Sequence, residues 1–273
     1  FRESMMAIYA QKKGLSGKTL GLLVGGVAVA AAALMVYFNA TRETLDKETL
    51  CPSTGPKGQF VVLIDNTSPF PFTQKIALGQ RLKTMVTEEL PEGYLLSVFL
   101  LGEDFRVNEK PLFERCNPGQ WKDRNQQMNN KKFVDRDFNQ KFVKPFDDIV
   151  HKISLEERSK NSPIFQMLQL VGINGFERAH VSGERRLVIY SDMLANMPEF
   201  SMYKASPLSY ADFRKTAYGQ NAMAPGLHGS SVLINLLAAD QKALQNTRLS
   251  MFWEQYFQDN GVSVEGFSRV EGL

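Results

Sequence analysis

Oxygen-bearing side chains follow or open three segments that lie far apart in the sequence. Two carboxylates come directly after apolar runs of the kind that form buried strands, a threonine stands two positions after the first of them, and a serine opens a helical pattern between them. Carboxylate and hydroxyl oxygens are hard ligands that suit Mg²⁺ or Mn²⁺, which keep part of their water shell. The candidate metal ligands are Asp65, Thr67, Ser162 and Asp192.

Each of these residues also has a simpler structural explanation. An aspartate after a strand often caps the next helix, and Ser162 before Pro163 fits an N-cap followed by proline at the first helical position. These explanations account for each segment singly, but not for the order of all three along one chain. We therefore favour one shared site over three unrelated caps.

Other common catalytic patterns are absent from the sequence. No G-x-x-x-x-G-K-[ST] or G-x-G-x-x-G phosphate-binding motif occurs, and no G-x-S-x-G elbow surrounds a serine. The histidines and cysteines form no cluster with zinc-ligand spacing. Surface or core positions are therefore expected for His151, His180 and His228.

A metal-dependent hydrolase of the phosphatase type is the alternative that uses the same carboxylates, Asp65 and Asp192. The D-x-D pattern of haloacid-dehalogenase phosphatases would need an aspartate at position 67, where Thr67 stands. We therefore predict that the protein is not an enzyme.

The hydrophobic pattern alternates between strands and helices. Continuous apolar runs predict buried strands at 60–64, 94–101, 186–190 and 231–238, with shorter strands at 111–116 and 262–265. Amphipathic spacing predicts helices at 73–90, 142–153, 163–171 and 241–258. This alternation predicts an α/β fold with a doubly wound, mostly parallel sheet, whose ligands bind at the carboxyl ends of the strands.

Several segments together resemble the von Willebrand factor A-like (vWA) domain, over about residues 58–273. FVVLIDNTSPF resembles the DxSxS motif of that family's metal-ion-dependent adhesion site, NSPIFQML the opening of its middle helix, and LVIYSDML the strand bearing its last aspartate. WEQYFQDNG resembles its last helix. The resemblance implies a Rossmann-like fold with a Mg²⁺ site formed by Asp65, Thr67, Ser162 and Asp192.

Pro69 departs from the family pattern, because it stands where the second serine of DxSxS is expected and has no hydroxyl. The resemblance therefore implies a degenerate adhesion site that lacks one ligand. It also implies an interaction module of a cell-envelope assembly, with an aspartate or glutamate of a protein partner completing the Mg²⁺ shell.

Residues 19–38 form an uncharged apolar segment of 20 residues. As a helix it would be about 30 Å long, which matches the hydrocarbon thickness of a bilayer. We predict a single transmembrane helix that follows a basic tail, residues 1–18, and precedes a polar linker, residues 39–57. The folded domain is predicted at 58–273.

The charge distribution indicates the orientation of this segment. Residues 1–18 carry four basic residues and one acidic residue, so the net charge of +3 lies in the tail and the rest of the chain is balanced. The positive-inside rule then predicts a cytoplasmic N-terminus and an extracytoplasmic domain, periplasmic in a Gram-negative bacterium, on a single-pass inner-membrane protein. A balanced body argues against nucleic acid as a partner.

Two further features concern partners and redox state. Gly21 and Gly25 are four residues apart, and small residues at this spacing allow close helix packing, so another membrane protein is an expected neighbour. Cys51 and Cys116 are the only cysteines, and an extracytoplasmic domain would favour a disulfide between them.

Overall fold

The computed structural model describes residues 17–40, 44–69, 71–123, 130–153, 158–177, 179, 181, 183–205, 207–239 and 241–270. The predicted basic tail up to residue 16 lies outside this part of the chain, as does His180. The chain divides into two compact units, residues 1–44 and residues 45–273.

The first unit contains one long helix, α1 (Gly17–Ala40), over the predicted apolar segment. Its side chains are described for residues 25–37, and all of these are exposed. Within the described residues, no helix has both the length and the apolar character that crossing a membrane requires. The helix predicted over residues 19–38 is confirmed, whereas its membrane span stays a prediction.

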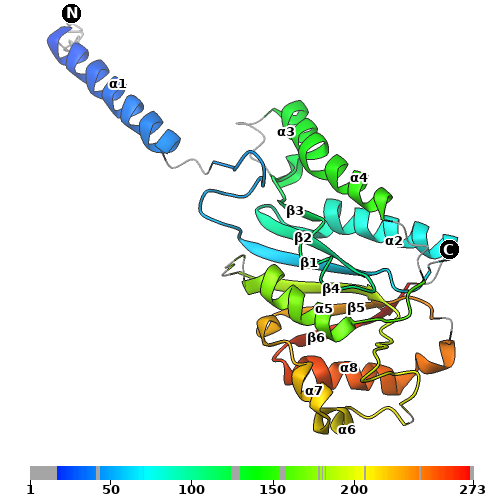
Figure 1. Ribbon diagram of the computed structural model, residues 1–273. Helices are drawn as coiled ribbons and strands as arrows, with labels where there is room; N and C mark the ends of the chain where they lie inside the picture. The colour runs from blue at the N-terminus through cyan, green and yellow to red at the C-terminus, as the bar shows by residue number, and fades with distance from the viewer. Residues whose placement is uncertain are drawn as a thin grey trace, which may run out of the picture. The chain divides into compact units, whose positions relative to one another are not determined.

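The second unit is built on a six-stranded sheet (Figure 1). The strands are β1 (Gly58–Asp65), β2 (Tyr94–Leu101), β3 (Phe113–Cys116), β4 (Arg185–Ser191), β5 (Ser231–Leu236) and β6 (Ser263–Arg269). Their order is β3-β2-β1-β4-β5-β6, and all neighbours are parallel except β2 and β3. The order reverses between β1 and β4, so the predicted doubly wound, mostly parallel sheet is confirmed.

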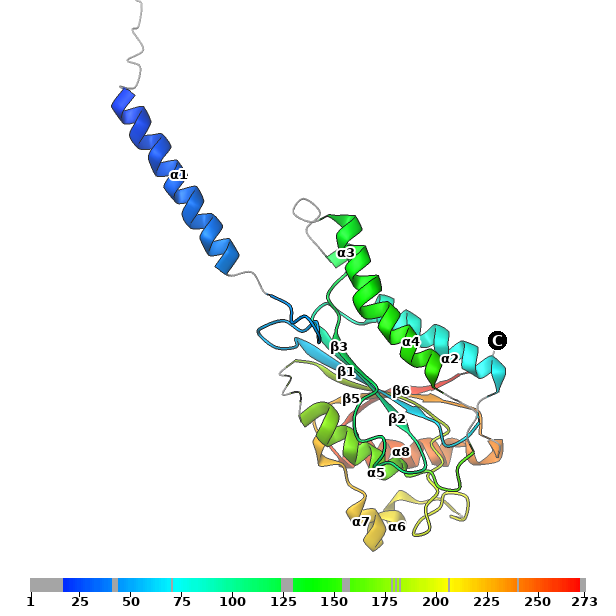
Figure 2. The same ribbon diagram turned by 45° about the horizontal axis from the view of Figure 1, so that its top comes forward.

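Helices cover both faces of the sheet (Figures 1 and 2). One face carries α2 (Phe72–Thr84), α3 (Lys131–Phe138) and α4 (Lys144–Lys152). The other carries α5 (Ile164–Leu170), α6 (Tyr210–Lys215), α7 (Ala217–Asn221) and α8 (Thr247–Asp259). Because side chains alternate along a strand, β1 supplies Phe60, Val62 and Ile64 to the first core and Val61 and Leu63 to the second.

An aromatic cluster fills the core beneath α5 and α8. The ring of Phe165 stacks on Phe213 and on Trp253, with centroids 4.9 Å apart in both pairs. Aromatic rings carry large buried areas and dominate such cores. The aromatic residues of α8 are thus core residues, namely Phe252, Trp253, Tyr256 and Phe257.

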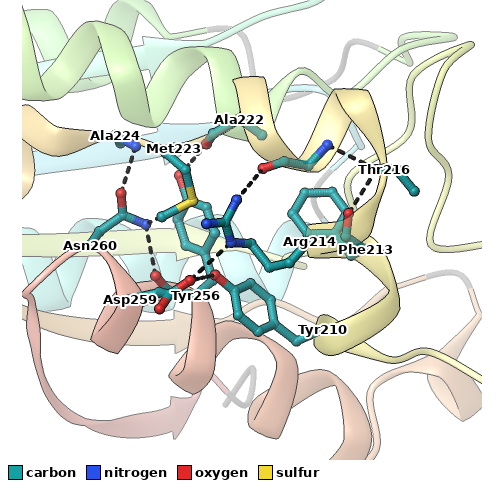
Figure 3. A network of polar contacts seen from close by, with 11 residues as sticks. Tyr210, Phe213, Arg214, Thr216, Ala222, Met223, Ala224, Tyr256, Asp259 and Asn260 are labelled. Atoms are coloured by element: carbon teal, nitrogen blue, oxygen red, sulfur yellow. Dashed lines mark hydrogen bonds and ion pairs between the residues drawn. The ribbon is translucent and has the colours of Figure 1, made fainter.

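Polar contacts hold α6 and α7 against the end of α8, as Figure 3 shows. Asp259 Oδ2 accepts hydrogen bonds from Tyr210 Oη at 2.7 Å and Arg214 Nε at 3.0 Å. Buried Asn260 accepts from the backbone N–H of Ala224 at 2.6 Å. These contacts fix the insertion between β4 and β5, whose two short helices the sequence pattern did not predict.

Residues 45–57, predicted as a linker, belong to the second unit. Asp46 Oδ1 accepts hydrogen bonds from the backbone N–H and the hydroxyl of Thr49, and the Thr49 carbonyl accepts from the N–H of Cys116 at 2.8 Å. Cys51 and Cys116 form a disulfide. The packed domain therefore begins at Leu45, because this segment is bonded to the edge strand β3.

The last helix is shorter than the amphipathic pattern of the sequence predicts. The expected helix at 241–258 begins at Thr247, where the side chain of Asn246 accepts from the N–H of Arg248 and caps it. The preceding residues form a short 3₁₀ turn, Lys242–Leu244. A local cap thus overrides the hydrophobic periodicity at this end.

Candidate functional site

The four predicted ligands lie at the carboxyl edge of the sheet, where β1 and β4 are parallel neighbours. Asp65 is the last residue of β1, and Asp192 directly follows β4. This is the point where the strand order reverses, the usual place for a ligand in an open α/β sheet. Thr67 and Ser162 approach the same place from the two adjoining loops.

Both oxygens of the Asp65 carboxylate are held by hydroxyl groups. Thr67 Oγ1 lies 2.7 Å from Oδ1, which also accepts from the Thr67 N–H at 2.9 Å. Ser191 Oγ donates to Oδ2 at 2.5 Å, across from the neighbouring strand. The carboxylate therefore has a fixed orientation.

Burial controls the protonation of this carboxylate. The side chain of Asp65 is 3% exposed. Desolvation raises the pKa of Asp65 above its ordinary value, while the hydrogen bonds from Ser191 and Thr67 act in the opposite direction. Among the described residues, no cation forms an ion pair with it, so nothing of opposite charge offsets its burial.

The hydroxyls of Thr67 and Ser162 meet 3.1 Å apart, although they are 95 residues apart in sequence. The backbone fixes Ser162, because its N–H donates to the carbonyl of Asn196 at 2.8 Å and its carbonyl accepts from the Asn196 N–H at 3.1 Å. Both hydroxyl-bearing residues are buried. The middle loop is thus tied both to the first loop and to the segment after β4.

The carboxylate of Asp192 lies across a small cavity from this group. Its Oδ1 accepts from the N–H of Leu194 at 2.9 Å, and Ser68 Oγ lies 3.4 Å from its Oδ2. Asp65 and Asp192 line a cavity of about 10 Å³ together with Ser68 and Pro69. This volume corresponds to the space of about one water-sized sphere.

The residue after Asp192 has an unusual backbone. Met193 has a φ angle of +59°, in the left-handed region that residues other than glycine rarely adopt. Its N–H donates to Ser191 Oγ at 2.8 Å, and its carbonyl accepts from Trp253 Nε1 at 2.9 Å. These two contacts hold the turn that directs Asp192 toward the cavity.

The spacing of two hydroxyl oxygens at this edge is close to that required by a small hard cation. Adjacent ligands of an octahedral Mg²⁺ lie about 2.9 Å apart, given metal–oxygen distances of about 2.0–2.1 Å. The Thr67 and Ser162 hydroxyls are 3.1 Å apart. Among the described residues, no group of three or more His, Cys, Asp or Glu side chains could hold a metal. A metal ion at this edge would therefore need the hydroxyls of Thr67 and Ser162 as ligands in addition to the two carboxylates. Pro69 contributes none.

Sequence reasoning missed one member of this cluster. The structure brings Asp65, Thr67, Ser162 and Asp192 to one edge, but it adds Ser191, which is 1% exposed and bonded to Asp65. Its position directly before Asp192, at the end of a buried run, was the available signal.

No protein-family model and no curated protein matches the chain. Among solved structures, it is similar to an aerotolerance-related membrane protein from Bacteroides fragilis NCTC 9343 with multiple mutations to serines, at 11% identity and a TM-score of 0.41, over 78% of this chain and 92% of that one. It is also similar to the VWA domain of SpRpn10, at 8% identity and a TM-score of 0.40, over 79% and 90%. At these values neither similarity carries an inference about function.

Proposed function

We propose that the second unit is a vWA-like interaction module that binds a protein partner at the carboxyl edge of its sheet, within a cell-envelope assembly. The observation that carries this proposal is the convergence of Asp65, Thr67, Ser162 and Asp192 from three distant segments. The hydrogen bonds that link Asp65, Thr67 and Ser162, and the cavity that Asp65 lines with Asp192, support a single recognition site rather than three separate caps.

Mg²⁺ is the ion that this site would hold. Asp65, Thr67, Ser162 and Asp192 would bind it, directly or through water, and the ion would supply a coordination position for a carboxylate oxygen of the partner. Ionisation of Asp65 costs free energy in this buried place, and a cation would offset that cost. Metal occupancy would thus control partner binding.

A binding role accounts for Asp65 better than a hydrolytic one. The D-x-D pattern of the phosphatase alternative needs a second carboxylate at position 67, where Thr67 stands and donates its hydroxyl to Asp65 Oδ1. We therefore propose that the protein is not an enzyme.

We further propose that α1 anchors the protein in a membrane with the second unit outside the cytoplasm. Residues 19–38 carry no charge, and the described side chains of α1 include large exposed apolar groups such as Val27 and Met35. Gly21 and Gly25 would face another membrane protein. The Cys51–Cys116 disulfide supports the outward side, because disulfides persist in oxidising compartments.

The experiment combines metal response with partner capture. In the full chain, we expect Mg²⁺ to raise the unfolding temperature. Exposed Tyr203 lines a hollow together with Thr67 and Ser162, and we expect a photo-crosslinking residue in its place to capture a partner in an Mg²⁺-dependent way. The same residue in place of Phe133, exposed on α3, serves as the matched control.

Loss of the carboxylates should remove both responses. We expect Asp65→Asn and Asp192→Asn to abolish the Mg²⁺ shift and the crosslink, because each removes a charged oxygen ligand. Asp148→Asn, on the exposed face of α4, makes the same change elsewhere and should behave like the wild type. Unchanged crosslinking in both site variants would overturn the proposal.

A further inference from the structure

A second feature lies beside the carboxylate cluster, a hollow of about 410 Å³. It shares Thr67, Ser68 and Ser162 with the candidate metal site, and it extends away from that site between residues 158–162 and 194–204. Its volume lies within the range of about 300–1,000 Å³ that is usual for small-ligand sites. We call it the basic hollow, because basic residues contribute to its lining.

Three basic residues contribute to the lining of the basic hollow, Arg158, Lys160 and Lys204. None of the described lining residues is acidic. Within the part of the chain that the structure describes, neither Lys160 nor Lys204 has an ion-pair partner. Their charges are therefore available to an anion.

The backbone around the hollow is fixed by hydrogen bonds. Short antiparallel bridges join Ser162 to Asn196 and Asn196 to Ser201. The side-chain amide of Asn196 also donates to the carbonyl of Lys160 at 2.8 Å, and the N–H of Ser159 donates to the Thr67 carbonyl at 3.0 Å. A lining held in this way is organised before a ligand arrives, which reduces the entropic cost of binding.

One lining residue, Ser201, carries a buried hydroxyl that has no partner. Ser201 is 8% exposed, and its Oγ makes no hydrogen bond. Buried hydroxyls almost always have a partner, and an unmade hydrogen bond costs free energy. An oxygen-rich anion that reached this hydroxyl from the hollow would accept the hydrogen bond that Ser201 lacks.

We propose that the basic hollow binds a phosphoryl group. A phosphoryl dianion carries up to two negative charges and three acceptor oxygens, which match the two ammonium groups and the hydroxyls of Ser159 and Ser201. A carboxylate carries one charge and two oxygens, and would leave one ammonium group uncompensated. The phosphoryl group belongs either to a small phosphate ligand or to a phosphorylated side chain.

The test uses inorganic phosphate and the full chain in mild detergent, with EDTA present so that the metal site plays no part. Phosphate should raise the unfolding temperature above that in sodium chloride of the same ionic strength. The variant Lys160→Gln/Lys204→Gln should bind phosphate at least about tenfold more weakly, because hydrogen bonds to charged groups are worth about a factor of ten or more. Ser201→Ala should weaken binding by about the same factor.

The matched control is Lys131→Gln/Lys132→Gln, which removes two exposed charges from α3 and should leave phosphate binding unchanged. Equal phosphate responses in the wild type and the Lys160→Gln/Lys204→Gln variant would overturn the proposal. Because EDTA is present, this result is independent of whether the Mg²⁺ site exists.

Two short peptides distinguish the source of the phosphoryl group. A phosphoserine peptide that binds more tightly than inorganic phosphate would assign the hollow to a phosphorylated protein, and equal affinity would assign it to a small phosphate ligand. A glutamate peptide that binds as tightly as the phosphoserine peptide would contradict the phosphoryl assignment.

Discussion

At the scale of single residues, the protonation of Asp65 links the site to the stability of the domain. Burial raises the pKa of this carboxyl in the folded state above its ordinary value of 3.8. The folded protein then holds the proton more tightly than the unfolded chain does. The stabilisation from the protonated form is complete below the ordinary pKa, and it is lost as pH rises through the raised folded-state pKa.

We therefore expect Asp65→Asn to become more stable relative to the wild type as pH rises from 4 to 7 in metal-free buffer. The asparagine cannot ionise, and each pKa unit of difference is worth about 1.4 kcal/mol. Unfolding temperatures of both proteins across this range measure the effect. Parallel curves would show that Asp65 does not titrate in this way.

Sequence reasoning finds some residues of this site more readily than others. Asp65 and Asp192 are visible because each follows a buried apolar run, which places it at a strand end. Ser191 also stands at the end of such a run, but its contact with Asp65 depends on the pairing of β1 with β4, which the local sequence does not show. The lining residue Ser201 lies in the long segment after β4, whose course depends on backbone bridges that no local pattern encodes.

At the scale of elements, the Cys51–Cys116 disulfide joins the segment before β1 to the edge strand β3. It closes a loop with a sequence separation of 65. Restricting a loop of this length in the unfolded chain is worth about 4 kcal/mol in the chain-entropy model, with about 2–4 kcal/mol typical of measured bridges.

We expect Cys51→Ala/Cys116→Ala to lower the free energy of unfolding by about 2–4 kcal/mol, measured by urea denaturation. Dithiothreitol should lower the free energy of unfolding of the wild type by a similar amount and leave that of the variant unchanged. Wild-type stability that does not respond to complete reduction of the bridge would contradict this expectation.

The larger elements were predictable because their patterns are long. The buried strands β1, β2, β4 and β5 lie where continuous apolar runs predicted them. The short helices α6 and α7 have six and five residues, too few for a clear period. Their N-cap residues are Ser209 and Thr216. Such caps alone do not predict helices this short, which are held in place by packing on α8.

At the scale of the whole molecule, the proposed anchor has a direct test. We expect the full chain to remain in the membrane fraction after a carbonate wash and to be released by detergent. Val29→Arg should weaken insertion, because an arginine at the centre of a membrane helix costs about 2.5–3.5 kcal/mol. Val29→Ala, at the same position, is the control. Release of the wild type by carbonate alone would show that α1 does not span the bilayer.

The disulfide between Cys51 and Cys116 also determines how a mechanical force would be transmitted through a protein that is anchored by its N-terminal helix. A pull on residue 44 reaches the edge strand through this covalent bond before it reaches residue 58, where β1 begins. The force would therefore act first on the edge strand β3, and less of it would reach the central strand β1, which ends in Asp65. With the bridge cut, the same pull would run through residues 52–57 straight into β1, so the load path of the molecule would change with its redox state.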